Sequence, residues 1–473
     1  MRTIGKLSTG ISINNVADIN TDKDRQILFR GATILSMDPN VGDLRSGDVL
    51  IHGKKIEAVA KDLSSATSND NVLVIDAAGY VLTPGLQDVH RHCWYGQLRR
   101  TMPDTSDVGE YFSLFYNKLA PLFSLEDIYV GTLISALSSI DAGITNIHDV
   151  LTNAYTAAHG DAAIEALCDA GIRGTHVQFG SLTGQGAEQW PRDLRRVKEK
   201  FFSSQDQLQS LRLGVLGSGY LVSEDVVITP KKIEFARDLG IAITADAVVL
   251  KMASDNIEAL GRAGLLGPDI LLTHCLELSD EAWRMIADNG VGVALTTTSD
   301  ARFGSLNAIS PMQKCLDLRL RAVGIGIDTE VNSRADLFAQ IDATLVLQRA
   351  LMFNRRYVDN RSDCEGMSLK DIFSWATIGG ARATGDDHRV GSITPGKEAD
   401  LLAFNVSNIN NLPVNDPYGA VVSASSVRDL ELVMIAGVIR KWDGELLDVD
   451  LEALRLRAET SRDRLLAGEH LWN

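Results

Sequence analysis

The sequence predicts an α/β protein in which a TIM (β/α)8 barrel is inserted into a small β-sandwich domain built from both ends of the chain. Three observations support this prediction. Strand-like and helix-like segments alternate between residues 81 and 390, short strand-like segments flank that stretch, and 473 residues are too many for one ordinary core. We therefore expect an N-terminal arm (1–26), the composite β domain (27–80 with 391–449), the barrel (81–390) and a C-terminal helix (450–473).

The two flanking segments both carry strand signals. On the N-terminal side, the runs ILFRGATILSM, GDVLIHGKKIEAVA and NVLVIDAAGYVLTPG are separated by turns rich in glycine and aspartate. On the C-terminal side, GSITPGKEADLLAFNVS and LELVMIAGVIRKWDGELL show the same pattern. Beyond them, residues 450–466 have the pattern of a charged amphipathic helix. We expect the two sets of strands to pair into one domain.

Within the central stretch, apolar runs and helix-periodic segments follow one another in the order of a parallel barrel. After the strand before His90, the expected strands are Ile144–Val150, Gly174–Gly180, Leu211–Gly217, Ile241–Val249, Ile270–Cys275, Gly292–Leu295 and Val323–Asp328. The helical segments between them include Leu125–Asp141, Asp161–Ala170, Pro230–Leu239, Asp280–Asn289 and Ala335–Met352. About eight strand–helix units result, the number in a TIM barrel. A doubly wound open sheet is the alternative, but no glycine-rich fingerprint accompanies these strands.

The composition restricts partners and compartment. The net charge is −16, from 46 lysines and arginines against 62 aspartates and glutamates, which disfavours nucleic acid and anionic membranes as partners. The five cysteines are scattered without a C-x-x-C pair, which indicates a reducing compartment. The sequence contains no run of 18 apolar residues and no signal pattern, so we expect a cytoplasmic protein without membrane segments.

His90 and His92 form the clearest chemical motif. They follow a short apolar strand that is interrupted by Pro84-Gly85. On an extended backbone, residues i and i+2 lie on the same side, so both imidazoles face one space. Two neutral imidazoles held in this way suit a borderline divalent ion such as zinc. A coincidental surface pair is the alternative, but the chain has only nine histidines.

Further polar residues lie where the expected barrel strands end. The carboxyl ends of barrel strands converge on one mouth, where the active sites of such folds form. Asp328 ends an apolar strand, where a buried carboxylate needs an ion or a partner, although a helix cap is the alternative role. His274 lies near the tip of another strand. The other candidates near strand ends are His148, Asp149, His176, Gln178, Ser218, Tyr220, Thr244, Asp246, Thr297, Thr298 and Asp300.

The segment LTPGLQDVHRH, which contains both histidines, resembles the PG-x-x-D-x-H-x-H signature of the amidohydrolase superfamily of metal-dependent hydrolases and deaminases. Gly391–Leu401 resembles the C-terminal signature of the same superfamily. The resemblance covers nearly the whole chain and is greatest to the branch of cytosine deaminase-like and s-triazine hydrolase-like enzymes. It implies a TIM barrel and a homo-oligomer, a dimer or a tetramer. It also matches His274 to the sixth-strand histidine and Asp328 to the final-strand aspartate of the family.

One strand departs from the family pattern. The fifth strand of the family usually ends in a ligand histidine, which the deaminases follow with a glutamate three residues later. In this chain, Asp246 and Val249 occupy those two positions. Aspartate can still bind an ion, but valine cannot transfer a proton, which counts against nucleobase deamination. No lysine ends the fourth strand, so we expect one ion.

The substrate is expected to lie against residues near the ligands. Trp94 and Tyr95 follow the histidine pair after Cys93 and would present aromatic surface, which favours a planar or apolar small molecule. Packing of these two side chains under the first helix is the alternative. Thr298 and Asp300, after the seventh strand, are the expected polar contacts.

These residues predict a metal-dependent hydrolase that cleaves a C–N bond of an amide, urea, carbamate or amidine by attack of a metal-bound hydroxide. One divalent ion, zinc or else iron, cobalt or manganese, is expected on His90, His92, Asp246, His274 and Asp328. Asp328 would carry the proton and His274 would stabilise the oxyanion. Two alternatives are a deaminase of a heterocyclic substrate with another proton carrier, and a non-catalytic protein with a degenerate metal site.

Overall fold

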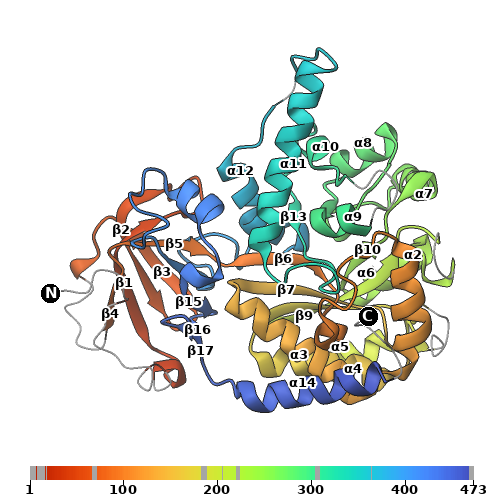
Figure 1. Ribbon diagram of the computed structural model, residues 1–473, viewed down its shortest axis with the longest axis horizontal. Helices are drawn as coiled ribbons and strands as arrows, with labels where there is room; N and C mark the ends of the chain where they lie inside the picture. Colours follow the sequence, from red (N-terminus) through yellow and green to blue (C-terminus); the bar gives the residue numbers. More distant parts are fainter. Residues whose placement is uncertain are drawn as a thin grey trace.

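A closed barrel of eight parallel strands forms the centre of the molecule (Figure 1). The computed structural model describes residues 7, 16, 19–65, 72–182, 189–204, 206–219, 224–303, 309–363 and 365–467. The barrel strands are β6 (Leu86–Arg91), β7 (Ile144–Leu151), β8 (Arg173–Gln178), β9 (Gln209–Leu216), β10 (Ala242–Asp246), β11 (Ile270–Thr273), β12 (Gly292–Leu295) and β13 (Val323–Ile325). β13 pairs with β6 and closes the barrel, which confirms the predicted TIM barrel.

Helices cover the outside of the barrel. The longer ones are α3 (Leu125–Asp141), α4 (Ala157–Ala170), α5 (Leu194–Phe201), α6 (Pro230–Leu239), α7 (Leu250–Arg262), α8 (Asp280–Asp288) and α11 (Leu337–Tyr357). Local sequence sets their limits: Ser124 and Asp127 form a capping box that starts α3, and Gly171 and Gly240 end α4 and α6 in the left-handed conformation. Their inward apolar side chains and those of the strands form one continuous core.

Shorter helical elements complete the barrel domain. Between β6 and α3 lie η2 (Cys93–Leu98), α2 (Val108–Tyr111), η3 (Phe112–Leu119) and η4 (Ala120–Leu122). Further along the chain lie η6 (Glu224–Val226), α9 (Thr297–Phe303), α10 (Met312–Asp317), α12 (Leu369–Ser374), η7 (Trp375–Gly379), α13 (Gly380–Thr384), η8 (Gly419–Ala424) and η9 (Val427–Asp429). The elements between β6 and α3 stand over the carboxyl end of the barrel and supply part of the pocket wall described below.

Strands from both ends of the chain form a second, mixed sheet of nine strands. They are β1 (Gln26–Ile34), β2 (Leu44–His52), β3 (Lys55–Ala60), β4 (Val72–Asp76), β5 (Tyr80–Pro84), β14 (Leu401–Asn405), β15 (Leu430–Ile435), β16 (Val438–Trp442) and β17 (Glu445–Leu446). The two halves join where β5 pairs antiparallel with β14, with Leu82 opposite Ala403. The predicted β domain built from both chain ends is thereby confirmed, and its strands form one sheet.

The alternation of side chains along β14 shows how the two domains are joined. Leu401 and Ala403 pack into the separate core of the mixed sheet, whereas Leu402 and Phe404 point the other way into the core of the barrel. The sheet therefore shares an apolar boundary with the barrel.

A charged cluster, the sheet-side cluster, lies at the same boundary. The guanidinium of Arg173, the first residue of β8, donates to both carboxylate oxygens of Asp400 at 2.9 Å and to Glu398 Oε2 at 2.7 Å. Glu398 Oε1 accepts from Arg389 at 3.2 Å, and Asp400 also accepts from the backbone of Ala436. All three residues of the Arg173–Glu398–Asp400 group are buried.

Pro84 and Gly85 separate two strands rather than interrupting one. Residues 80–84 form β5 of the mixed sheet, and a different strand, β6, carries His90 into the barrel. A Cβ on Gly85 would lie 2.0 Å from Thr145 Oγ1, so only glycine allows the chain to cross so closely to β7. The strand before His90 therefore belongs to the sheet, and the motif marks the passage between the two domains.

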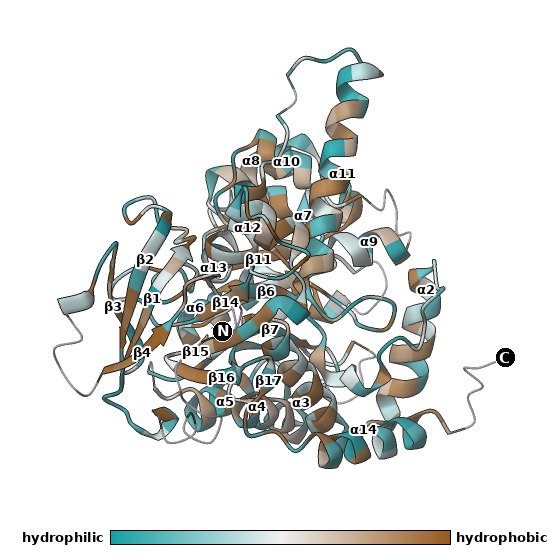
Figure 2. Cartoon of the chain, turned by 60° about the vertical axis from the view of Figure 1, so that its left-hand side comes forward, coloured by the Kyte–Doolittle hydropathy of each residue, from teal (hydrophilic) through white to brown (hydrophobic). Residues whose placement is uncertain are grey.

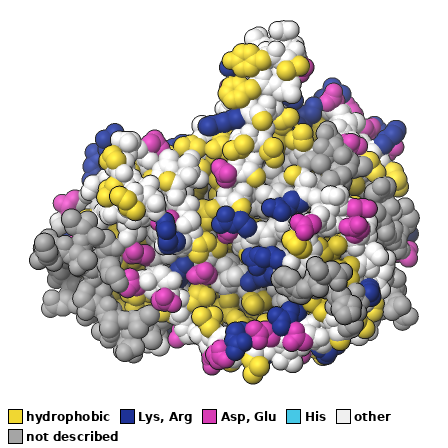
Figure 3. Space-filling model, viewed as in Figure 1, with side chains coloured by type: hydrophobic (Ala, Val, Ile, Leu, Met, Phe, Trp, Pro, Cys, Tyr) yellow, Lys and Arg dark blue, Asp and Glu magenta, His cyan; other side chains and the backbone are white. Residues whose placement is uncertain are grey.

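Two helices extend along or beyond the outside of the barrel. The expected C-terminal helix is α14 (Leu451–Leu465), which runs beneath α3, where Ser461 donates a hydrogen bond to Asp127 (Figure 1). α11 projects from the body, and both helices alternate hydrophilic and hydrophobic segments (Figure 2). Phe353 and Tyr357 of α11 are 47% and 72% exposed, and hydrophobic side chains are visible on this projection in Figure 3. No helix among the described residues combines the length and apolar character needed to cross a membrane.

Candidate metal centre

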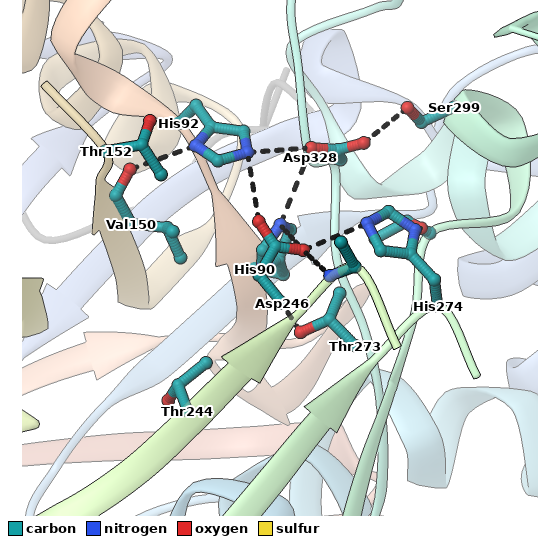
Figure 4. A network of polar contacts seen from close by, with 12 residues as sticks. His90, His92, Val150, Thr152, Thr244, Asp246, Thr273, His274, Ser299 and Asp328 are labelled. Atoms are coloured by element: carbon teal, nitrogen blue, oxygen red, sulfur yellow. Dashed lines mark hydrogen bonds and ion pairs between the residues drawn. The ribbon is translucent and has the colours of Figure 1, made fainter. Parts of the chain in front are cut away.

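Five side chains from four barrel strands converge at the carboxyl end of the barrel (Figure 4). His90 lies within β6 and His92 directly follows it, Asp246 ends β10, His274 follows β11, and Asp328 follows β13. These are the five residues that the sequence predicts as ligands, and the structure brings all of them together. We call them the mouth cluster.

The imidazole nitrogens of the mouth cluster face the two carboxylates. Nε2 of His90 lies 3.6 Å from an oxygen of Asp246 and 3.5 Å from one of Asp328. Nε2 of His92 lies 3.7 Å and 3.2 Å from oxygens of the same two carboxylates. Nε2 of His274 lies 3.1 Å from Asp246 Oδ1. The nitrogens and oxygens thus surround one common space.

The donor set of the mouth cluster fits a divalent metal ion. Nε2 of His90 is fully buried and has no hydrogen-bond partner among the described residues, a costly condition unless an ion binds there. Two sets of three residues have ligand atoms within 4.8 Å of one another: His90, His274 and Asp328, and His90, His92 and Asp246. Neutral imidazoles with carboxylates are the ligands of a borderline ion such as zinc.

A second set of contacts fixes the imidazole rings. Nδ1 of His92 donates to the carbonyl oxygen of Val150 at 3.0 Å, and Nδ1 of His90 lies 3.3 Å from Thr273 Oγ1. These contacts leave both Nε2 atoms directed at the common space, an arrangement that fixes the ligating nitrogen in metal sites. On the opposite side, Ser299 donates a hydrogen bond to Asp328 Oδ2.

His274 is held by a carboxylate that was expected to contact substrate. Its Nδ1 lies 2.8 Å from Asp300 Oδ1, and Thr296 Oγ1 approaches both atoms at 2.8 and 3.1 Å. Asp300 also accepts from Ser310. Asp300 therefore contacts a candidate ligand directly, besides lining the pocket. Thr296 and Ser310 gave no signal in the sequence, because ordinary hydroxyl residues near a strand end are common.

The backbone is strained at two members of the mouth cluster. His274 and Asp328 have φ angles of 71° and 67°, the left-handed region that side-chain-bearing residues rarely adopt. Cys275, the residue after His274, also has a positive φ of 53°. Such conformations persist where the surrounding fold imposes them, and they turn the strand ends towards the common space.

His92, His274 and the two carboxylates of the mouth cluster shift one another's pKa values towards the charged forms. Burial raises the pKa of Asp246 and Asp328, but the neighbouring histidines outweigh it and hold the pKa of both carboxyls below the usual range. Burial likewise disfavours protonation of His274, yet the adjacent Asp300 and Asp246 raise its pKa well above its usual value. The pKa of His92 is also raised, because Asp328 and Asp246 outweigh its burial. Two ionised carboxylates therefore face the space at neutral pH.

A pocket of about 140 Å³ opens over the mouth cluster. Its wall is largely apolar and aromatic, with the polar groups concentrated at one end. The lining residues are His92, Val108, Tyr111, Phe112, Tyr116, Leu182, Leu216, Ser218, Asp246, Ala247, Val249, His274, Leu276, Ser299, Asp300, Phe303 and Asp328. Val249, at the position of the family's glutamate, is among them.

Three residues expected to bind substrate lie outside this wall. Trp94 and Tyr95 are fully buried behind it, where Tyr95 shares a hydrogen bond of 2.7 Å with Tyr111. Thr298 contacts Gln340 through its backbone and its hydroxyl. The aromatic wall comes instead from α2 and η3, with Phe303 of α9, because η2 turns Trp94 and Tyr95 into the core.

The other strand-end candidates support the barrel rather than join the mouth cluster. Nε2 of His148 lies 2.8 Å from Thr244 Oγ1, and burial together with Arg212 lowers the pKa of His148 well below its usual value. Nδ1 of His176 lies 3.3 Å from Asp149 Oδ2. Thr297 shares a hydrogen bond with Thr344, and Gln178 is buried beside β7. Ser218 lines the pocket, whereas Tyr220 lies outside the described residues.

Two known proteins of similar sequence are named as deaminases. The 5'-deoxyadenosine deaminase of Methanothermobacter thermautotrophicus is 27% identical over 437 residues, which cover 89% of this chain and 95% of that protein. The 5-methylthioadenosine/S-adenosylhomocysteine deaminase of Acetivibrio thermocellus is 26% identical over 413 residues, which cover 83% and 88%.

Two solved structures of similar fold contain zinc. A zinc-bound adenosine deaminase from Xanthomonas campestris superimposes with a TM-score of 0.78 at 20% identity, covering 94% of this chain and 99% of that one. A variant of atrazine chlorohydrolase from Arthrobacter aurescens, with zinc and atraton, gives 0.79 at 21% identity, covering 92% and 99%. The model of the amidohydrolase family matches residues 81–440. From the barrel, the mouth cluster and this match we conclude that the chain belongs to the amidohydrolase family.

Proposed function

We propose that this protein is a metal-dependent hydrolase that cleaves a C–N bond in a small organic molecule of the amide, urea, carbamate or amidine type. The observation that carries the proposal is the mouth cluster itself. Two carboxylates held below their usual pKa face a buried imidazole nitrogen without a partner, and this assembly opens into an apolar pocket. One divalent ion, with zinc as the first choice, would be held by His90, His92 and Asp328 together with Asp246 or His274.

The ion supplies Lewis-acid activation of water at neutral pH when it is bound. Asp328 is placed to accept the proton of the attacking water and to return it to the leaving nitrogen. Its Oδ2 accepts from Ser299, which fixes the plane of the carboxylate. His274, held at Nδ1 by Asp300, directs Nε2 towards the same space and stabilises negative charge that develops on the substrate oxygen.

Val249 separates this proposal from nucleobase deamination. The residue lines the pocket and therefore faces the substrate, but its side chain cannot protonate a ring nitrogen. Release of an amine from an acyl-type carbon needs only the proton that Asp328 carries. Deamination of a heterocycle is the second candidate function, because the relatives that match most of the chain are named as deaminases.

The test combines metal analysis with product identification. Purified protein should contain about one ion per chain, and removal of the ion should abolish hydrolysis that returns on adding zinc. Panels of amides, carbamates, amidines and purine nucleosides, followed for free amine and for ammonia, then separate the two candidates. Ammonia from a nucleoside as the main product would contradict the first candidate and support the second. Protein that is folded but neither binds an ion nor hydrolyses any panel member contradicts both.

The pair Asp246 and Val249 gives a sharper test. Asp246→His should keep the ion but should produce no nucleoside deamination, since Val249 still supplies no proton. Combining it with Val249→Glu adds the missing acid, and combining it with Val249→Gln is the matched neutral control. Deamination that appears with glutamate and not with glutamine would show that this position decides the reaction.

A further inference from the structure

The pocket is bordered by several acidic side chains but by no lysine or arginine among the described residues. Three carboxylates border it, those of Asp246, Asp300 and Asp328, and no lysine or arginine is among the described lining residues. The chain segments 183–188, 220–223 and 304–308, which follow lining residues in sequence, also contain neither lysine nor arginine. A divalent ion would offset two of the three negative charges, and Asp300 is already paired with His274 at 2.8 Å. No lysine or arginine of the described wall is therefore placed to pair with an anionic group on a substrate.

Neutral hydrogen-bond donors are not free to replace the missing cations. The hydroxyl of Ser299 donates to Asp328, and that of Ser218 donates to the carbonyl oxygen of Ala247 at 3.3 Å. The hydroxyl of Tyr111 is engaged with Tyr95 at 2.7 Å, and that of Tyr116 with Thr152 at 2.9 Å. An anionic group held against this wall, away from His274 and the ion, would lose its hydration without gaining a free hydroxyl or a cationic side chain, which is strongly unfavourable in a buried site.

The remaining wall favours uncharged or cationic groups. Phe112 and Tyr116 stack with ring centroids 4.9 Å apart, and Tyr111 and Phe303 pack at 5.0 Å. Aromatic faces bind flat apolar groups, and their negative faces attract cations. The aromatic rings and the carboxylates therefore both favour uncharged or cationic groups over anionic ones.

We propose that the pocket accepts a flat or apolar amide-type or amine-bearing substrate without a negative charge and discriminates against anionic analogues. This inference rests on the proposed function for the identity of the reacting group, but its charge preference concerns binding alone. The charge of the substrate is a property that the TIM-barrel fold alone does not determine.

Three benzamides of similar shape test the charge preference. They carry a methyl, an aminomethyl or a sulfonate group at the para position, and are neutral, cationic and anionic. Sulfonate replaces carboxylate because a carboxylate could bind the ion itself. Calorimetric titration of the zinc-loaded full chain should give a dissociation constant at least about tenfold weaker for the sulfonate than for the methyl compound. The aminomethyl compound should bind at least as tightly as the methyl compound.

A charge placed in the wall provides the matched variants. Phe112, half-buried in the wall, is changed to lysine, and Phe112→Met removes the ring without adding charge. Phe112→Lys should reduce the sulfonate-to-methyl ratio of dissociation constants at least about threefold relative to Phe112→Met. Val346→Lys, on the exposed side of α11, controls for net charge and should leave the ratio unchanged.

Two results would overturn the inference. One is sulfonate binding as tight as or tighter than that of the methyl compound in the unaltered protein. The other is failure of all three compounds to bind, because the pocket would then not take flat amides. The proposed function fails separately: a protein that binds the compounds in the predicted order but hydrolyses no C–N bond in the panel loses that function and keeps this preference.

Discussion

The mouth cluster and the sheet-side cluster are both buried and charged, and they lie at opposite ends of the barrel strands. In the sheet-side cluster, Arg173 reaches both carboxylates directly at 2.7–2.9 Å, and every carboxylate oxygen of Glu398 and Asp400 accepts a hydrogen bond. In the mouth cluster, His90 Nε2 lies 3.5 and 3.6 Å from the nearest carboxylate oxygens and bonds neither.

The difference distinguishes a cluster with a structural role from the cluster that we propose binds a metal ion. Carboxylates with all their partners inside the protein hold two domains together and need nothing further. A cluster in which an imidazole nitrogen faces carboxylates without a hydrogen bond to them is suited to binding a ligand such as a metal ion. Burial and charge are shared by both, and Arg173 Nη1 also lacks a partner. The two clusters differ in their carboxylates and imidazoles: Glu398 and Asp400 bond Arg173 directly, whereas His90 Nε2 bonds neither carboxylate that it faces.

The largest expected effect is the loss of metal from the mouth cluster. Removing a partner that merely orients a ligand costs about 10–100-fold in metal affinity, so removing a ligand should cost more than about 100-fold. His90→Ala and His92→Ala should therefore lose nearly all bound ion and activity, with unchanged circular dichroism. Full metal occupancy in both variants, measured by elemental analysis, would overturn the distinction.

The sheet-side cluster should respond in stability instead. Arg173→Leu leaves Glu398 and Asp400 buried without their main partner, which should cost about 3–5 kcal/mol in the free energy of unfolding. Urea unfolding measures the loss, and the folded fraction should keep its metal. The control is Arg237→Leu, which breaks a half-exposed pair with Asp269 and should cost less than about 1 kcal/mol. Equal effects of the two variants would contradict the structural role.

Asp300 should show an intermediate effect on the mouth cluster. Asp300→Asn keeps the shape but withdraws the charge beside His274, so metal affinity and kcat should each fall about 10–100-fold. The matched control is Thr298→Ala, which alters a neighbouring polar residue outside the pocket wall and should change neither value more than about threefold. A larger effect of Thr298→Ala would restore the substrate contact that the sequence predicts for it.

The smallest expected effect is a pH dependence of the sheet-side cluster. Burial raises the pKa of Glu398, but Arg173 and Arg389 outweigh it and hold the pKa below its usual value. A lowered pKa means that this stabilisation is complete above the unfolded pKa of about 4.3 and is lost as the pH falls towards the folded value. Glu398→Gln should therefore be about 1.5–3 kcal/mol less stable at pH 7, with a gap that narrows below pH ~4. A stability difference between the two proteins that stays constant down to the pH of acid unfolding would show that the charge of Glu398 is not the cause.

Much of the site could be predicted from strand ends. His90, His92, Asp246, His274 and Asp328 all follow apolar runs, and a barrel necessarily brings the carboxyl ends of such runs together. Topology places the strand ends together, and the resemblance to the amidohydrolase superfamily selected Asp246, His274 and Asp328 from the other polar residues there.

The pocket wall could not be predicted in the same way. Trp94 and Tyr95 adjoin the ligands in sequence, but a turn of 3-10 helix rotates them into the core and leaves Phe112 and Tyr116 at the wall. Their direction depends on the helix type and on packing against later segments, which no local pattern records. The Asp300–His274 contact likewise depends on α9, which is separated from the end of β12 by one residue.

The joining of β5 with β14 has a consequence for the synthesis of the protein. Every candidate ligand and all eight barrel strands precede residue 329, whereas β14, β15 and β16 come after residue 400. A ribosome therefore synthesises every candidate ligand while one edge of β5 still lacks its partner. Until β14 emerges, that edge and the apolar residues beside it are open to other chains. During this interval the chain already contains the candidate ligands, but the strand that covers the edge of β5 has not yet been synthesised. Binding of the ion at that stage would favour the compact barrel.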